Sequence, residues 1–494
     1  MPIVIPKDDD FLAPLKQKCM EFVRSHPGSR TGCGQGIREQ FNTNTAFIDG
    51  SAIYGQTKAK ADSLRTFQDG NLDVFAPTSD PHYALPPQNA KASDCIAPTA
   101  TKKCFKAGDS RVNVHLGIAE VQTLWLRQHN FVANILRDLN PRWNDEKLYQ
   151  EARHIVAAQL QHIAYNEFLP ILLGEDIMDK WNLQIMEEGS TDDYDITLNP
   201  SILNEFSTAA YRVGHTMVPN LFPRADKDFG VRKKEQLRST YFRPFALYDK
   251  DAFDEIILGM VSSPTQEIDN NFVDDLTNHL FELPGDAFGL DLTALNVQRG
   301  RDHGLQGWMK WRKLCGLSTA SNFDELRGMD IVSTEIVDRM ADNYDDIEDV
   351  DVYAAGAAEN HMSGARVGPT FGCIIAEQFR RLKFGDRFWY ENNLPLPSSL
   401  TEKQIDAIHG VTMSRILCDN TPLMESVQLN AFLLSDPESN PVTSCSKIPP
   451  INYRRWRIKS RKGRSVPNSE SIDEALHHNA TVYQFFDSQH KRHR

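Results

Sequence analysis

The feature that most constrains the fold of this chain is a helical spacing of apolar residues over several long segments. Between residues 116 and 139, and again between 147 and 173, apolar side chains recur every three to four positions. This period places them on one face of an α-helix. A third such segment covers residues 204–217 and is followed by Pro219. Strand patterns are sparse, so we predict a mainly α-helical fold with few short strands, in one large domain.

Length and charge narrow the class of protein further. The chain has 494 residues, enough to bury a large core. Its 54 Lys and Arg against 67 Asp and Glu give a formal charge of −13, which argues against a nucleic-acid partner. No apolar run approaches the ~18 residues that a membrane-spanning helix needs, so we expect no membrane span.

The cysteines suggest disulfides without proving them. An even number of cysteines is compatible with disulfides, although buried thiols and metal sites are alternatives. None of them has the C-x-x-C spacing of a zinc site. The amino-terminal residues Met1–Pro6 lack the basic start and apolar stretch of a signal peptide. The eight cysteines are Cys19, Cys33, Cys95, Cys104, Cys315, Cys373, Cys418 and Cys445.

Two short motifs indicate a haem site. The first is Y-R-V-G-H at residues 211–215, and the second is A-L-N-V-Q-R-G-R-D-H-G at residues 294–304. Taken alone, a His on an apolar helix face is usually a core residue, and an Asn in a loop-like stretch is usually a turn residue. Together the motifs resemble the proximal haem site of the animal haem peroxidases, the family of peroxidasin, peroxinectin and myeloperoxidase. The resemblance implies that His215 binds the haem iron and that Asn296 accepts its ring proton.

The resemblance covers almost all of residues 2–456. It implies the haem-peroxidase fold for a domain at residues 1–456, followed by a basic tail at 457–494 that we predict to be disordered. Further landmarks follow in the family's order: T-A-F-I-D-G-S at 45–51, A-G-D-S-R at 107–111, L-N-P-R-W at 139–143, V-G-P-T at 367–370, G-D-R-F-W-Y-E-N at 385–392 and C-D-N-T at 418–421.

Three arginines match family positions around the haem. Arg212 and Arg299 match arginines at the haem edge, where each could pair with a propionate. For Arg299 the alternative is a surface salt bridge. Arg111 matches the arginine of the peroxide side, whose role would be to stabilise charge as the O–O bond splits.

Other polar residues near these motifs are interpreted as structural. Asp302 and His303 are tempting catalytic candidates, but the family does not use that His as a ligand. His129 and His162 lie within the periodic helices and are interpreted as packing residues with satisfied hydrogen bonds.

The chain also departs from the family pattern. Val114 and His115 stand where relatives often carry Glu and Met, so the corresponding covalent links to haem cannot form. The G-Q-x-x-D-H-D pattern, which carries the family's distal His and an Asp that binds both haem and calcium, does not occur before Asn44. His26 is the one histidine in that stretch. We therefore expect that the sequence is incomplete at its amino end.

A calcium site is half present in the sequence. Thr45, Phe47, Asp49 and Ser51 occupy the family's ligand positions, and their oxygens suit a hard cation. The alternative is an ordinary polar loop.

The resemblance also implies a disulfide pattern and a compartment. Its domain carries bridges between neighbouring cysteines, which predicts four sequential pairs, beginning with Cys19–Cys33. Such bridges imply an oxidising, extracellular or secretory compartment.

These observations lead to a functional prediction. The resemblance implies a peroxidase that binds haem b and uses hydrogen peroxide to oxidise halide, phenolic or tyrosyl substrates. One alternative is a non-catalytic extracellular binding or adhesion protein on the same fold. Another is a fragment of an active enzyme. Residues 454–464 hold seven basic side chains, which could contact a polyanion of the extracellular matrix, form a processing site, or belong to a solvated tail.

Overall fold

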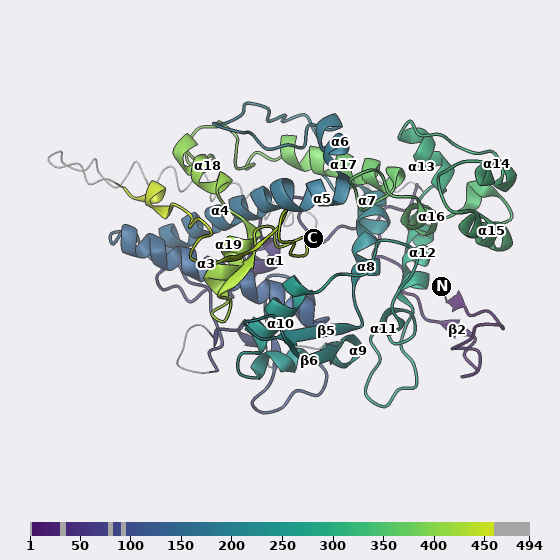
Figure 1. Ribbon diagram of the computed structural model, residues 1–494, viewed down its shortest axis with the longest axis horizontal. Coiled ribbons are helices and arrows are strands. Elements are labelled where there is room, and N and C mark those ends of the chain that lie inside the picture. Colours follow the sequence, from purple (N-terminus) through teal and green to yellow (C-terminus); the bar gives the residue numbers. More distant parts are fainter. Residues whose placement is uncertain (1, 30–35, 78–82, 90–94, 459–494) are drawn as a thin grey trace.

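The computed structural model describes residues 2–29, 36–77, 83–89 and 95–458. Helices dominate this part of the chain, and its strands form only two-stranded antiparallel sheets (Figure 1). The prediction of a mainly α-helical fold is confirmed. The paired strands are β1 (Ile3–Val4) with β2 (Cys19–Met20), β3 (Gln88–Asn89) with β4 (Cys104–Phe105), β5 (Leu221–Ala225) with β6 (Val231–Gln236), and β7 (Ser426–Gln428) with β8 (Val442–Ser444).

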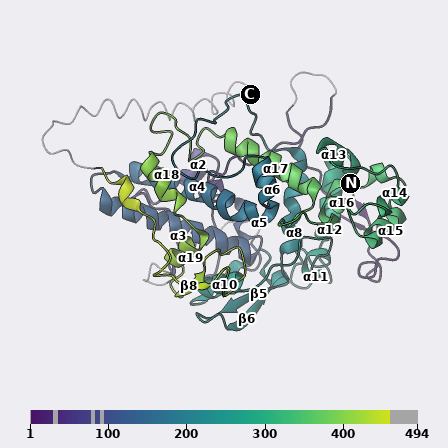
Figure 2. The same cartoon turned by 45° about the horizontal axis from the view of Figure 1, so that its top comes forward.

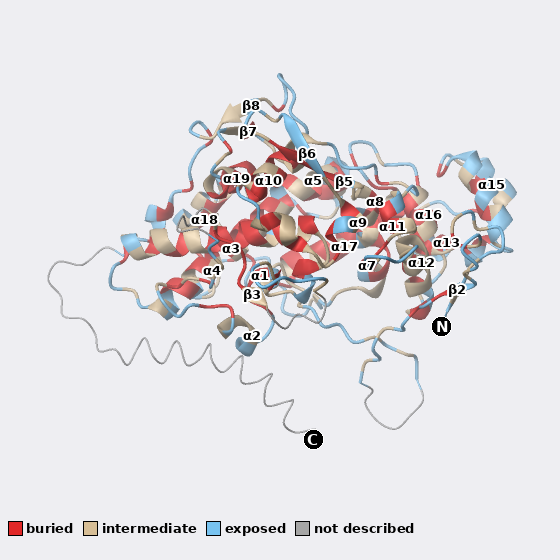
Figure 3. Ribbon diagram, turned by 90° about the horizontal axis from the view of Figure 1, so that it is seen from below, coloured by how far each residue is buried: buried red, intermediate tan, exposed pale blue. Residues whose placement is uncertain are grey.

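Two long helices, α3 (Leu116–Leu139) and α4 (Asp145–Ile163), form the centre of the core. A short turn joins them, and the side chain of Asn144 caps α4 by accepting a hydrogen bond from the backbone of Lys147. Their apolar faces are buried against each other and against the helices around them, as the red segments of Figure 3 show. The helices predicted from apolar spacing in this region are therefore present.

The predicted segment 147–173 is helical throughout but changes its winding. It consists of α4, a π-helical stretch η3 (Ala164–Phe168) and α5 (Leu169–Leu173). Pro170 lacks a backbone N–H and its ring crowds the carbonyl four residues earlier, which accounts for the wider turn before it. Gly174, with φ of 78°, ends the helix.

The widened turn buries a carboxyl group whose charge costs stability. Glu167 is 6% exposed and accepts a hydrogen bond from the backbone N–H of Met413 at 2.7 Å. Burial raises its pKa from 4.5 to about 7, against the opposing effect of that hydrogen bond. Because the folded state holds this proton more tightly than the unfolded state, the free energy of unfolding falls as pH rises from about 4.5 to about 7.

Glu167→Gln should remove this pH dependence. Relative to the unmodified protein, we expect the free energy of unfolding to increase by up to about 3 kcal/mol at pH 8 and to change little at pH 4. Urea denaturation at both pH values measures the difference. The exposed Glu188→Gln serves as control, and an equal effect of Glu167→Gln at both pH values would contradict the prediction.

The predicted helix over residues 204–217 is not continuous, so this prediction is wrong in detail. Ala209, with φ −131° and ψ −74°, separates α7 (Asn204–Thr208) from a 3₁₀ turn η4 (Ala210–Val213), which leads into α8 (Gly214–Met217). The apolar spacing persists across the break because both pieces bury side chains in the same core. Apolar spacing reports which face is buried, and it does not report whether the backbone hydrogen bonds continue.

A smaller lobe lies at one end of the molecule (Figures 1 and 2). It contains α13 (Trp308–Leu314), α14 (Phe323–Arg327), α15 (Thr334–Asn343) and the turn η6 (Ile347–Asp349). These elements bury an apolar cluster of their own around Trp308, Leu326 and Val337. The disulfide Cys315–Cys373 ties the lobe to α17 (Pro369–Phe384) in the main body.

The remaining elements surround the core. The hairpin β5–β6 lies beside α10, and two elements that frame the site described below are α12 and α16. Their bounds, with those of the other short helices, are α1 (Ser51–Tyr54), α2 (Lys58–Asp62), η2 (Ser110–Asn113), α6 (Glu175–Lys180), α9 (Leu237–Thr240), η5 (Pro244–Tyr248), α10 (Ala252–Ser262), α11 (Asp274–Thr277), α12 (Leu292–Asp302), α16 (Val352–Ala358), α18 (Glu402–His409), α19 (Met413–Asn420) and η7 (Tyr453–Trp456).

Three of the four predicted disulfides are confirmed. They are Cys95–Cys104, Cys315–Cys373 and Cys418–Cys445. Cys19 is exposed and has no disulfide partner among the described residues, while Cys33, its predicted partner, lies outside them. None of the described helices is both long and apolar enough to cross a bilayer.

The end of the described chain packs against the core. Tyr453 and Trp456 of η7 are buried, and the Trp456 carbonyl accepts a hydrogen bond from Asn140 at 3.1 Å. The predicted domain boundary after Trp456 stays a prediction, since residues from Lys459 onward lie outside the described part. The predicted contact between the basic tail and a polyanion falls largely on those residues.

Candidate functional site

The structure brings His215 and Asn296 together. His215 lies on α8, and Asn296 lies on α12, fully buried, with its amide nitrogen 3.0 Å from Nδ1 of the His215 ring. The stretch around Asn296, interpreted from sequence as loop-like, is a helix. Asp291 begins this helix, because its carboxylate accepts hydrogen bonds from the backbone N–H groups of Thr293 and Ala294.

The environment keeps the His215 ring neutral. Burial, and next the nearby positive charge of Arg212, lower the pKa of His215 to about 4, against the opposing hydrogen bond from Asn296. A neutral imidazole is the form that binds a metal ion. Nδ1 faces Asn296, and Nε2 makes no hydrogen bond with any residue that the structure describes. One ring nitrogen is therefore oriented by a partner and the other is left for a ligand, which fits an axial ligand of haem.

The hydrogen bond between these residues runs opposite to the expectation. The amide oxygen of Asn296 accepts from Nη1 of Arg212 at 2.7 Å, so the amide turns its nitrogen toward the ring and donates to Nδ1. The Arg212 guanidinium, whose Nε also donates to the Ser207 carbonyl at 3.1 Å, causes the reversal. Arg212 is thus part of the site. In this structure its partner is Asn296, the residue that orients the His215 ring.

Tyr353 on α16 completes this group and was not found from the sequence. It is 2% exposed, and its hydroxyl accepts a hydrogen bond from the amide nitrogen of Asn296 at 3.0 Å. Burial raises the pKa of Tyr353, although the Asn296 hydrogen bond opposes this. No motif marks Tyr353 in the sequence, because its role depends on a contact with Asn296. That residue lies on another helix, 57 positions earlier in the chain.

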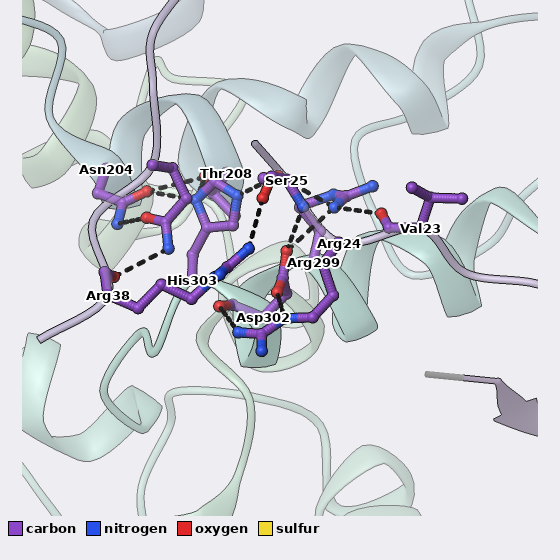
Figure 4. Close-up of polar contacts among 10 residues, drawn as sticks. Val23, Arg24, Ser25, Arg38, Asn204, Thr208, Arg299, Asp302 and His303 are labelled. Atoms are coloured by element: carbon purple, nitrogen blue, oxygen red, sulfur yellow. Dashed lines mark hydrogen bonds and ion pairs between the residues drawn. The ribbon is translucent and has the colours of Figure 1, made fainter. Parts of the chain in front are cut away.

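Arg299 lies one turn further along α12 and is held by the amino-terminal segment (Figure 4). Its Nη1 donates to the Val23 carbonyl at 2.9 Å, to the Ser25 hydroxyl at 3.0 Å and to Asp302 at 3.1 Å. The guanidinium also lies 4.2 Å from the centroid of the Phe22 ring. The predicted haem contact of Arg299 stays a prediction.

Asp302 and His303 belong to the same network (Figure 4). Although burial opposes it, hydrogen bonds from Arg24 and from the Ser25 N–H lower the pKa of Asp302 to about 2. His303 contacts the Ser25 hydroxyl through Nε2 and the Asn204 amide oxygen through Nδ1, each at 2.7 Å.

This order of Ser, His and Asn resembles a hydrolytic triad, but it lacks a free oxyanion donor at the serine. The Ser25 N–H already donates to the Asp302 carboxylate, and the Ser25 hydroxyl oxygen already accepts a hydrogen bond from Arg299. The geometry supports the structural interpretation of Asp302 and His303, which fasten residues 23–25 to α12.

Arg111 is placed apart from these residues. It lies in η2, and its Nε and Nη2 donate to the Asp109 carboxylate at 3.0 and 2.7 Å. Its side chain is 64% exposed. The predicted peroxide-side role of Arg111 stays a prediction, and the structure shows that its charge is already paired with its own neighbour.

The residues at which the chain departs from the family pattern lie in ordinary packing environments. Val114 and His115 lead from η2 into α3, and the His115 ring stacks on Phe222 with centroids 6.0 Å apart. Burial lowers the pKa of His115 to about 4. His26 is exposed and packs edge-on against Phe41. Neither histidine contacts the His215 group through a hydrogen bond.

The candidate calcium residues form a local turn. Thr45 donates to the Phe47 carbonyl at 3.3 Å, and Asp49 accepts from the Ser51 N–H at 2.8 Å. Within the described ranges, no group of three or more His, Cys, Asp or Glu side chains is arranged to hold a metal ion.

The two helix histidines pack in the core. His129 is fully buried and pairs with the Tyr54 hydroxyl and the Gly70 carbonyl, each at 2.9 Å, which confirms its interpretation. His162 is also buried, and it contacts the Tyr390 hydroxyl at 3.0 Å and the backbone of His409 and Val411.

Comparison with known proteins gives a consistent picture. The sequence profile described as "Animal haem peroxidase" matches residues 1–432. Chorion peroxidase of Drosophila melanogaster is 35% identical over 463 residues, which cover 92% of this chain and 56% of that protein. Lactoperoxidase of Mesocricetus auratus is 36% identical over 468 residues, covering 92% and 63%.

A solved structure agrees with these matches. Peroxidase A from Dictyostelium discoideum superposes with a TM-score of 0.73 at 29% identity, covering 87% of this chain and 81% of that one. The chain spans less than two thirds of the length of the two relatives named above.

Proposed function

Because the chain belongs to the animal haem peroxidase family, we propose that it is a haem-dependent peroxidase that uses hydrogen peroxide to oxidise a halide, a phenol or a tyrosyl side chain. The observation that carries this proposal is the pairing of a neutral His215 ring, free at Nε2, with the buried amide of Asn296. The similarity to named peroxidases supports it.

The residues of the site suit haem b, whose iron supplies the redox chemistry when it is bound. His215 would bind the iron through Nε2, which requires that Nδ1 carry a proton and donate it. A half-turn of the Asn296 amide would present its oxygen to that proton. Arg212 now holds the oxygen, and a propionate is the kind of partner that could draw its guanidinium away. Arg299 is the second candidate for a propionate.

On the peroxide side we propose Arg111 as the cation that stabilises developing negative charge. Its bidentate pairing with Asp109 supports an ordered position, and it also means that Arg111 shares its charge with a carboxylate. Asp109 is therefore a residue that tunes the strength of this cation.

We also propose a calcium ion at the loop of Thr45, Phe47, Asp49 and Ser51. Burial, and in addition the negative charge of Asp49, raise the pKa of Asp386 to about 7. A buried carboxyl group that feels the charge of Asp49 supports a role for a cation here, since a divalent ion would relieve the repulsion between them.

We also propose an extracellular or secretory location. Three disulfides in the described chain suit an oxidising compartment. The predicted matrix contact of the basic tail stays part of this proposal.

Haem loading followed by a peroxide assay tests the proposed function. We expect the haem-loaded protein to oxidise iodide or free tyrosine only when hydrogen peroxide is added, as measured by triiodide absorbance or dityrosine fluorescence. Apoprotein is the control. Full haem incorporation without any peroxide-dependent oxidation would contradict the proposal and favour the non-catalytic binding alternative.

A further inference from the structure

The side-chain amide of Asn296 is held in one orientation by two residues besides His215. The first is Arg212, whose guanidinium can only donate hydrogen bonds, so the Asn296 atom 2.7 Å from its Nη1 must be the amide oxygen. The amide nitrogen therefore faces the other way. Both of its N–H groups are used, since one donates to Nδ1 of His215 and the other to the Tyr353 hydroxyl, each at 3.0 Å.

This nitrogen-inward orientation decides which ring nitrogen of His215 carries the proton. The ring is neutral at neutral pH, because its pKa lies at about 4, and a neutral imidazole has one N–H and one bare nitrogen. Since Nδ1 accepts a hydrogen bond from Asn296, Nδ1 is the bare nitrogen and the proton lies on Nε2. A ring nitrogen that carries a proton cannot bind a metal ion, so this tautomer keeps iron away from Nε2.

Tyr353 favours the nitrogen-inward orientation over the reverse. It is 2% exposed, and its hydroxyl has no other hydrogen-bond partner in the described part of the chain. Without this hydroxyl, the nitrogen-inward amide would keep a buried N–H with no acceptor, which is costly. If the amide oxygen faced inward instead, it could still accept from the His215 ring, so the same loss would cost less.

Arg212 favours the same orientation and lacks a counter-ion. Its guanidinium is half-buried, donates to the Ser207 carbonyl and the Asn296 oxygen, and forms no ion pair with any residue that the structure describes. An oxygen-inward amide would set its nitrogen against this guanidinium, so that two donors would face each other. The amide can therefore turn only when Arg212 moves to another acceptor, and an anion is the partner that suits it.

We propose that Tyr353 is a positioning residue that, with Arg212, holds His215 in the tautomer that cannot bind iron until an anion draws Arg212 away. The amide then turns, its oxygen accepts from Nδ1, and the ring proton moves from Nε2 to Nδ1 through solvent, so that the ring stays neutral. The Tyr353 hydroxyl, which accepts from Asn296 in this structure, then donates to the amide oxygen. The tautomer does not depend on the proposed function, whereas its coupling to haem binding rests on it.

Nitrogen-15 NMR of histidine-labelled full-length apoprotein at neutral pH tests the tautomer, because protonated and bare ring nitrogens resonate at different frequencies. His215→Gln identifies the signals, which should be those of a ring protonated on Nε2. Tyr353→Phe should raise the population protonated on Nδ1 about tenfold relative to the unmodified protein. Tyr344→Phe removes a hydroxyl that donates to Asp351, so it is the matched control and should change nothing.

The rate of haem binding tests the coupling to an anion. Haem dimethyl ester lacks both carboxylates and cannot draw Arg212 away, so we expect its Soret band to grow at least about tenfold more slowly than that of haem. Tyr353→Phe should speed binding of the ester more than binding of haem, because the nitrogen-inward orientation is weaker in this variant. Equal acceleration of the two would contradict the role of Arg212.

The outcomes separate this inference from the proposed function. A His215 ring protonated on Nδ1 in the unmodified apoprotein would overturn the inference whatever the peroxidase activity. An unchanged tautomer in a folded Tyr353→Phe variant would overturn the role of Tyr353. The expected tautomer, shifted by Tyr353→Phe, in a protein that bound haem without peroxidase activity would support the inference and contradict the proposed function.

Discussion

His215→Ala is expected to abolish haem binding. His215 is the residue whose free Nε2 and oriented Nδ1 fit an axial ligand, and in the proposed site its loss would remove the bond to iron itself. Loss of an outer partner of a metal ligand costs about 10–100-fold in affinity, so loss of the ligand should cost more. Titration of apoprotein with haem should give a Soret band in the unmodified protein and none, beyond that of free haem, in the variant.

Matched variants make this experiment specific. His26→Ala removes an exposed histidine and should bind haem normally. Asn296→Leu keeps the ligand but removes its orienting amide, so we expect an intermediate loss of about 10–100-fold in affinity. Circular dichroism should show that both His variants stay folded. A normal Soret band in His215→Ala would remove the assignment of His215 as the ligand.

Apolar spacing predicted the helical architecture because burial sets that spacing. Residues 116–139 form one helix as expected, because no local backbone preference in this segment opposes the helix that its apolar spacing predicts. The segment 204–217 breaks at Ala209, although its apolar side chains still point to the core. The winding change before Pro170 is a local backbone effect that apolar spacing cannot report.

Only those residues of the site that lie in sequence motifs could be predicted. His215 and Asn296 could be paired from the resemblance, yet the direction of their hydrogen bond depends on where the Arg212 guanidinium lies in space. Tyr353 could not be found, because a tyrosine between apolar helix residues looks like any core aromatic. The binding of Arg299 by residues 23–25 likewise arises from a contact between distant parts of the chain.

Glu359→Gln should strongly destabilise the junction between the smaller lobe and the main body. The Glu359 side chain is fully buried and pairs with Arg312 of α13, which is 3% exposed. It also accepts hydrogen bonds from the Trp308 indole N–H and from the Thr370 backbone N–H, each at 2.8 Å. Thr370 lies in the first turn of α17, where a negative charge is favourable. One carboxylate thus joins α13 to α17.

Removing that charge leaves a buried guanidinium without a counter-ion, which typically costs about 3–5 kcal/mol. We expect Glu359→Gln to lower the free energy of unfolding in urea by roughly this amount and to speed proteolysis within the smaller lobe. Glu377→Gln, on helix α17 and in partly exposed pairs with Arg380 and Arg381, should cost less than about 1 kcal/mol. Adding Arg312→Met to Glu359→Gln should recover part of the loss, because the unpaired charge is removed as well. If Glu359→Gln were no more destabilising than Glu377→Gln, the carboxylate would not be what holds the lobe to α17, and the Cys315–Cys373 disulfide and apolar packing would have to suffice.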